Sequence, residues 1–174
     1  MKQQVIRKRI KRFIQSTILL VMSATLMACS STTKTAVVSP RAKAALSSMN
    51  LAITQQNFTL FRDSMTTEFM KLGINVIDRT YVERILQEHQ FSQTGLTDPN
   101  TRRELGKLLG ATAIAILDFT PGDLPKASVQ VIDVETGAIL ISASYAYSAG
   151  MVKNIQPDHA EVSEIIGREI RRAF

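Results

Sequence analysis

From Phe58 to the end of the chain, apolar residues recur at spacings that alternate between helical and strand periods. The first helical stretch places five of them, three or four positions apart, on one face: Phe58, Phe61, Met65, Phe69 and Leu72. Gly73 follows, where a helix commonly ends in a left-handed residue. Residues 74–77 are apolar enough for a short strand. The pattern therefore predicts a helix followed directly by a strand.

Two more helices are predicted next. Asp78 or Thr80 can cap the first of them, and a loop is expected at residues 93–97. Asp98 then offers a capping carboxylate before Pro99, which suits the first turn of the second helix. The inward faces of the two helices carry Tyr81, Val82, Ile85 and Leu86 in one and Leu105, Leu108 and Leu109 in the other.

Three strands are predicted after these helices. Residues 111–119 are nearly all apolar, as in a strand that is buried on both faces. Proline and glycine residues between 121 and 125 then reverse the chain. Residues 128–134 and 138–147 form the other two strands, joined by a tight hairpin in which Gly137 can adopt a positive φ.

The order of the elements defines the fold class. A last amphipathic helix is predicted over residues 159–174, so the order is helix, strand, two helices, three strands and helix. This order predicts an α/β (α+β) fold with a mixed sheet of about four to five strands packed by three to four helices. Residues 51–54 are the candidate for a strand ahead of the first helix. One domain, residues 49–174, is expected, which is long enough for one core.

The beginning of the chain has a different pattern. Six basic residues fall within the first twelve, and a mostly apolar stretch over residues 13–28 follows, too short for a spanning helix. It ends in Leu26, Met27, Ala28 and Cys29, which resembles the lipobox of bacterial lipoprotein signals. The resemblance implies a signal peptide at residues 1–28 and acyl chains, including palmitate, on Cys29. The alternative is an uncleaved amphipathic anchor with an incidental buried cysteine.

The charge distribution changes the interpretation of the basic pI of about 9.7. Removing the first twelve residues leaves equal numbers of basic and acidic residues. The longest basic runs after Cys29 are the pairs Arg102-Arg103 and Arg171-Arg172. A neutral domain without a basic stripe lacks the electrostatic footprint of a nucleic-acid-binding protein. We therefore exclude nucleic acid as a partner.

The signal resemblance also implies a location. In envelope lipoproteins an Asp directly after the acylated cysteine favours the inner membrane, and this chain has Ser30 there. The expected location is thus the periplasmic side of the outer membrane. Cys29 is the only cysteine, so no intramolecular disulfide is expected. Residues 29–48 are rich in Ser, Thr, Lys and Ala, a composition that predicts a flexible tether.

A second resemblance lies within the domain. Its motif residues are Asp78-Arg79, Glu83 to Glu88, Gly95-Leu96-Thr97, Leu105 to Ala111, Val131 to Asp133 and Thr136-Gly137. This run resembles the CsgG-like family of curli-secretion-channel lipoproteins. That family includes the lipoproteins that activate penicillin-binding proteins, and its fold is similar to the amino-terminal domain of TolB. FlgO-like flagellar outer-membrane proteins are a more distant possibility.

Five residues of this run are expected to have structural roles. Gly106 would let its helix approach the sheet closely, and Gly110 would give that helix a left-handed end. Asp133 and Thr136 would hydrogen-bond the turn that Gly137 closes. None of the five is assigned a catalytic role.

Enzyme and metal motifs do not emerge from the sequence. Gly106-Lys107 lacks the upstream glycine of a phosphate-binding loop. His89 and His159 have no second ligand at metal-binding spacing. Glu83 and Glu88 fit a solvated helix face better than an acid and base pair, and Tyr145 and Tyr147 fit packing beneath the last helix. We therefore expect no cofactor, no metal and no catalytic residue.

The sequence thus favours a non-catalytic binding or assembly module of the cell envelope. It would be held to the membrane through Cys29 and would bind an envelope protein of a cell-wall, secretion or flagellar system. The family resemblance also implies self-association into a ring. A subunit of a secretion channel is the alternative, but the short turns between the predicted strands leave no room for two long membrane-spanning hairpins.

Overall fold

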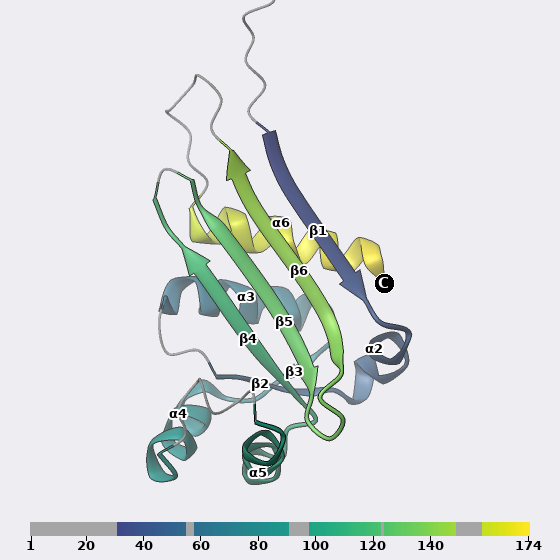
Figure 1. Cartoon of the computed structure of the whole chain (residues 1–174), viewed down its shortest axis with the longest axis vertical. Coiled ribbons are helices and arrows are strands. Elements are labelled where there is room, and N and C mark those ends of the chain that lie inside the picture. The colour runs from purple at the N-terminus through teal and green to yellow at the C-terminus, as the bar shows by residue number, and fades with distance from the viewer. Residues whose placement is uncertain (1–30, 55–57, 91–97, 123, 149–157) are drawn as a thin grey trace, which may run out of the picture.

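The computed structural model describes residues 31–54, 58–90, 98–122, 124–148 and 158–174 (Figure 1). The predicted signal peptide, Cys29 and the predicted 93–97 loop lie outside these ranges. The elements are β1 (Ser31–Val38), α2 (Pro40–Ala45), a 3-10 turn η1 (Leu46–Ser48), β2 (Asn50–Ile53), α3 (Thr59–Lys71), β3 (Asn75–Val76), α4 (Arg79–Glu88), α5 (Pro99–Leu109), β4 (Ala113–Thr120), β5 (Lys126–Asp133), β6 (Ile139–Ser148) and α6 (His159–Ala173).

The strands form one mixed sheet in the order β1-β6-β5-β4-β2-β3. The pairs β1-β6, β6-β5 and β5-β4 are antiparallel, whereas β2 runs parallel to both β4 and β3. The predicted α/β class is confirmed, with six strands in place of four to five. The described residues form five α-helices, one more than the predicted maximum. The candidate strand near Leu51 exists and lies between β4 and β3.

Helices cover the two faces of the sheet unequally. Helices α3 and α6 lie across one face, behind the four long strands in Figure 1, and enclose the larger core. Helices α4 and α5 lie at one end and cover the other face only around Ala52 and Ile114. The rest of that second face mixes small polar side chains, such as Thr35, Ser128 and Ser144, with apolar ones, such as Val37, Ile116 and Ile132. Among the described elements, helices thus cover one face of the sheet and only one end of the other.

The prediction of a tether at residues 29–48 is wrong from Ser31 onward. Strand β1 pairs with the whole of β6, from Ser31 opposite Ser148 to Val38 opposite Ile141. Few of its residues are apolar, but an edge strand gains its order from the backbone ladder as well as from burial. Its inward residues also contact α6, since the Lys34 ammonium lies 3.2 Å from the Glu169 carboxylate.

The helix boundaries follow the predicted caps. The Asp78 carboxylate accepts a hydrogen bond from the Tyr81 amide at 3.0 Å, and the Asp98 carboxylate accepts one from the Thr101 amide at 2.8 Å. In α3 the predicted core residues Phe61, Met65 and Phe69 are buried. Phe58 is the exception, because it precedes the helix with a φ of 55° and its side chain is 43% exposed.

A buried carboxylate joins α3 to α6. Glu68 is 4% exposed, and its oxygens accept hydrogen bonds from Lys71 Nζ at 2.6 Å and Arg171 Nη1 at 2.8 Å. Burial by itself raises the pKa of Glu68, but the hydrogen bonds from Lys71 and Arg171 outweigh it and leave the pKa below its ordinary value. Gly167 makes room for this carboxylate, because a Cβ there would overlap it. Both helices are thereby fixed over the same face of the sheet.

Candidate binding groove

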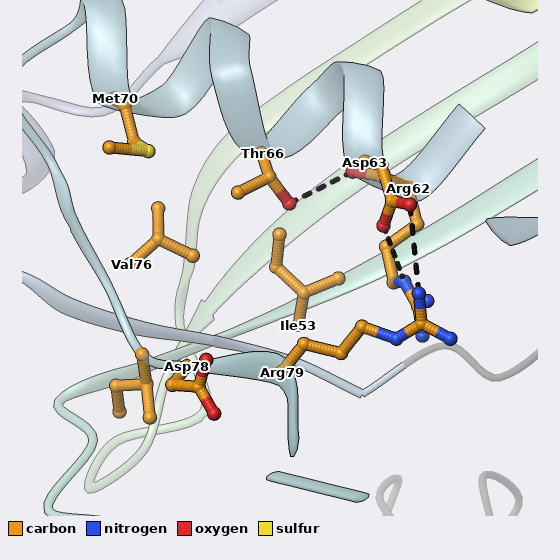
Figure 2. A pocket seen from close by; sticks show the side chains of 9 residues that line it. Ile53, Arg62, Asp63, Thr66, Met70, Val76, Asp78 and Arg79 are labelled. Atoms are coloured by element: carbon orange, nitrogen blue, oxygen red, sulfur yellow. Dashed lines mark hydrogen bonds and ion pairs between the residues drawn. The ribbon is translucent and has the colours of Figure 1, made fainter. Parts of the chain in front are cut away.

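A groove of about 330 Å³ lies between α3 and the segment that joins β3 to α4. Figure 2 shows α3 above it and Val76, Asp78 and Arg79 below it, with Ile53 between them. Ile53 closes its inner side, since it is 7% exposed and belongs to the larger core. The lining residues are Ile53, Arg62, Asp63, Thr66, Met70, Val76, Ile77, Asp78 and Arg79.

One end of the groove is charged but balanced. Arg62 donates from Nη1 to Glu83 Oε1 at 3.0 Å and from Nε to Asp63 Oδ1 at 3.3 Å. Arg79 donates from Nε to the same Glu83 oxygen at 2.7 Å, and its Nη1 lies 3.6 Å from Asp63 Oδ2. Two arginines thus neutralise two carboxylates. This end can offer guanidinium N–H groups and carboxylate oxygens to a ligand, and Asp78, which also lines the groove, adds a third carboxylate.

The network also fixes the protonation state of Glu83. The hydrogen bond from Arg79 contributes most to holding the pKa of Glu83 below its ordinary value, and Arg62 adds to it against the opposing effect of burial. A carboxyl group with a lowered pKa stays ionised at neutral pH and is a poor proton donor. The geometry therefore favours recognition over general acid catalysis.

The other end of the groove is apolar and borders the edge of the sheet. Met70 is 63% exposed, and Val76 is half-buried opposite it. Strand β3 is the last strand of the sheet, and the amides of Asn75 and Ile77 both donate towards β2. Because backbone groups alternate along a strand, the N–H and C=O groups of Val76 point away from the sheet. An extended segment lying in the groove could hydrogen-bond there.

The five predicted motif residues lie together at a different place, where α5 packs on the turn between β5 and β6. A Cβ on Gly106 would lie 2.3 Å from Val134 Cγ1, and Gly110 ends α5 with a φ of 64°. Asp133 Oδ1 accepts hydrogen bonds from the Thr136 amide and hydroxyl, both at 2.8 Å, and Gly137 follows with a φ of 73°. The structure does not bring this cluster into the lining of the groove.

The other residues considered from the sequence lie apart from the groove. His89 is the C-cap of α4, and His159 begins α6. Tyr145 is 3% exposed, and Tyr147 packs against the same core. In the described part of the chain, His, Cys, Asp and Glu side chains do not gather in groups of three that could hold a metal ion. None of its helices combines the length and the apolar character needed to cross a membrane.

Sequence reasoning missed most of the groove. Met70 and Thr66 lie on the polar side of α3, and nothing in their spacing distinguishes them from solvated residues. Arg62 looks like a solvated helix residue in the sequence, yet it is only 2% exposed. Its partner Glu83 is 21 positions away and is brought to it only by the fold. Two signals pointed to this region: the motif residues Asp78-Arg79 and Glu83, and the spacing of Arg79 and Glu83 at i and i+4.

We predict that Gly106→Ala destabilises the domain by about 1 to 3 kcal/mol, because the new methyl group would overlap Val134 in a packed core. Urea unfolding of the chain without its signal and Cys29 measures the loss. The double variant Gly106→Ala with Val134→Ala removes the overlapping methyl groups and should recover part of what the first change costs. If Gly106→Ala alone unfolds like the unmodified protein, the close packing of α5 on the turn is wrong.

With the fold and the groove described, the chain can be compared with known proteins. The fold is a mixed-sheet α/β domain with a groove at the sheet edge. No family model and no curated protein matches the chain. Among solved structures, the LpoB C-terminal domain from Salmonella enterica is 14% identical with a TM-score of 0.47, covering 58% of this chain and 83% of that one.

Two other solved structures show a similar course of the chain. The lipoprotein GNA1162 from Neisseria meningitidis is 15% identical with a TM-score of 0.49 and covers 63% of this chain and 86% of that one. The PelC dodecamer from Paraburkholderia phytofirmans is 10% identical with a TM-score of 0.41. The match covers 82% of this chain and 94% of that one. These likenesses are too distant to assign a family, so the function proposed below rests on the residues of this chain.

Proposed function

We propose that this protein is an outer-membrane lipoprotein of the periplasmic side that binds an extended segment of an envelope protein in the groove between α3 and β3. The proposed role is non-catalytic, and the protein would be attached to the membrane through acyl chains on Cys29. The observation that carries the binding role is the groove itself. It combines an apolar end, the edge of β3 that is unpaired among the described strands, and an end with paired arginines and carboxylates.

The chemistry of the groove suits a protein segment. A segment that adds to a sheet edge gains main-chain hydrogen bonds, and neighbouring pockets select its side chains. Val76 offers the main-chain groups, while Met70 and Ile53 offer apolar contact. Met side chains adapt readily to different apolar partners. The paired arginines and carboxylates would select polar side chains at the other end of the segment.

In this proposal the lipid anchor and the groove lie at opposite ends of the sheet. Strand β1 begins at Ser31, two residues after Cys29. Two residues span at most about 7 Å, so the lipid would hold the start of β1 close to the membrane surface. Strands β2 and β3 pair near the start of β4, which lies opposite Asp133 at the other end of the sheet. The groove would therefore face the periplasm.

Photocrosslinking in cells tests the proposal. A crosslinking amino acid in place of the exposed Met70 should capture one defined envelope protein, and Thr66→Arg should abolish that capture by filling the groove with a charged side chain. The matched control is the same crosslinker at the exposed Arg168 on α6, which should not yield the product. The same product from both positions, or capture that survives Thr66→Arg, contradicts a binding role for the groove.

A further inference from the structure

A second recognition feature lies at the turn between β5 and β6. Arg102, on α5, is only 7% exposed, and its Nε is buried without a hydrogen-bond partner. Its guanidinium lies against Gly137, where a Cβ would come within 2.5 Å of Nη2. Gly137 is thus the residue that leaves room for the arginine. Among the described residues, no acidic side chain forms an ion pair with Arg102.

The acidic groups near Arg102 are engaged elsewhere. Asp98 Oδ2 accepts from the Thr101 amide at 2.8 Å and from the Thr101 hydroxyl at 2.9 Å. Asp133 is held by Thr136, and its Oδ2 lies 3.3 Å from Arg41 Nη2. The neighbouring Arg103 donates its Nε to the backbone carbonyl of Glu135 at 3.2 Å. The turn is therefore bordered by guanidinium groups. Arg102 lies close enough to Asp98 to help lower the pKa of that carboxyl, after the larger effect of the Thr101 hydrogen bonds, but in the described structure it forms no direct ion pair with a carboxylate.

We propose that Arg102 binds a carboxylate presented by an acidic side chain of a protein partner, against the turn from Asp133 to Gly137. Buried charges in proteins are nearly always paired, because an unpaired one loses its hydration without compensation. The terminal nitrogens of Arg102 keep access to solvent beside Gly137, whereas the rest of the side chain is enclosed. A planar guanidinium fork in that position matches the two oxygens of a carboxylate.

The surroundings give this arginine the features of an interface anchor. Arginines that are held by packing and desolvated at the centre of a contact dominate binding energies more often than exposed ones. The packing against Gly137 fixes the orientation of the fork before a partner arrives, which lowers the entropy cost of binding. The turn also lies at the end of the sheet opposite Ser31, so it is open to the periplasm if Cys29 is the anchor. In that respect the inference rests on the proposed function.

The experiment follows the Arg102 Nε–Hε signal by NMR in the full-length lipoprotein in detergent micelles. The probe is a blocked hexapeptide that alternates Glu and Ala, compared with the same peptide carrying Gln for Glu and with inorganic phosphate. We expect the Glu peptide to shift this signal to saturation and the Gln peptide to leave it unchanged. Arg102→Lys keeps the charge but loses the planar guanidinium fork, so it should lower the affinity for the Glu peptide by about tenfold.

The control is Arg168→Met, which removes an exposed guanidinium from α6 and should bind the Glu peptide as the unmodified protein does. An unchanged Arg102 signal, an equal shift with the Gln peptide, or a shift with phosphate alone overturns the proposal. The titration of the unmodified protein needs no variant, so the test stands even if substitutions at Arg102 impair folding. Its outcome is also separate from the Met70 crosslink, which reports on the groove.

Discussion

Phe61→Ala is expected to lower the free energy of unfolding by about 3 to 5 kcal/mol, the range for removing a large aromatic ring from a packed core. Phe61 is 1% exposed, and its ring stacks on that of Phe119 with centroids 4.9 Å apart and an interplanar angle of 18°. The substitution removes this contact and leaves a cavity between α3 and the sheet. Urea unfolding of the chain from Ser30 onward, without signal and Cys29, measures the loss.

Leu60→Ala is the matched control for Phe61→Ala. Leu60 is the preceding residue of α3 and is 63% exposed, so the same kind of truncation should change stability by less than about 0.5 kcal/mol. A similar loss for both variants would mean that the inward face of α3 has been assigned wrongly.

Cys29→Ser is expected to block acylation and signal cleavage by the lipoprotein route. The hydroxyl of serine cannot receive the thioether-linked lipid of a lipoprotein, so fatty-acid labelling and globomycin-sensitive processing of the chain should both disappear. Labelling with a fatty-acid analogue measures the first effect, and the size of the chain with and without globomycin measures the second.

Ser30 provides the controls for Cys29→Ser. Ser30→Ala should leave labelling and outer-membrane location unchanged, since it preserves the cysteine and adds no acidic residue after it. Ser30→Asp should keep the lipid but shift the protein to the inner membrane. Labelling that persists in Cys29→Ser would refute the anchor.

The helices and long strands could be predicted because their signals are local. The spacing of Phe61, Met65 and Phe69 fixes one face of α3, and Asp78 and Asp98 cap the helices that follow. These features depend on residues within a few positions of one another. They did not require knowledge of the sheet order.

Strand β1 and the groove could not be predicted because their signals are not local. The Ser-rich and Thr-rich sequence of β1 becomes ordered only because the edge of β6 lies beside it, 109 positions away at Thr35 and Ser144. The burial of Glu68 could not be predicted for the same reason. It is a polar residue on the apolar face of α3, and its ion-pair partner Arg171 comes from the last helix. Arg102 resembles a surface residue in sequence, and only Gly137 reveals its burial.

The claim that this domain is held at the membrane through Cys29 is tested most directly by the mass of the amino-terminal peptide of the mature protein, isolated from envelopes and measured by mass spectrometry. We expect a peptide that begins at Cys29 and carries a diacylglyceryl group and an amide-linked acyl chain. An unmodified peptide that runs through Ala28 and Cys29 would contradict it.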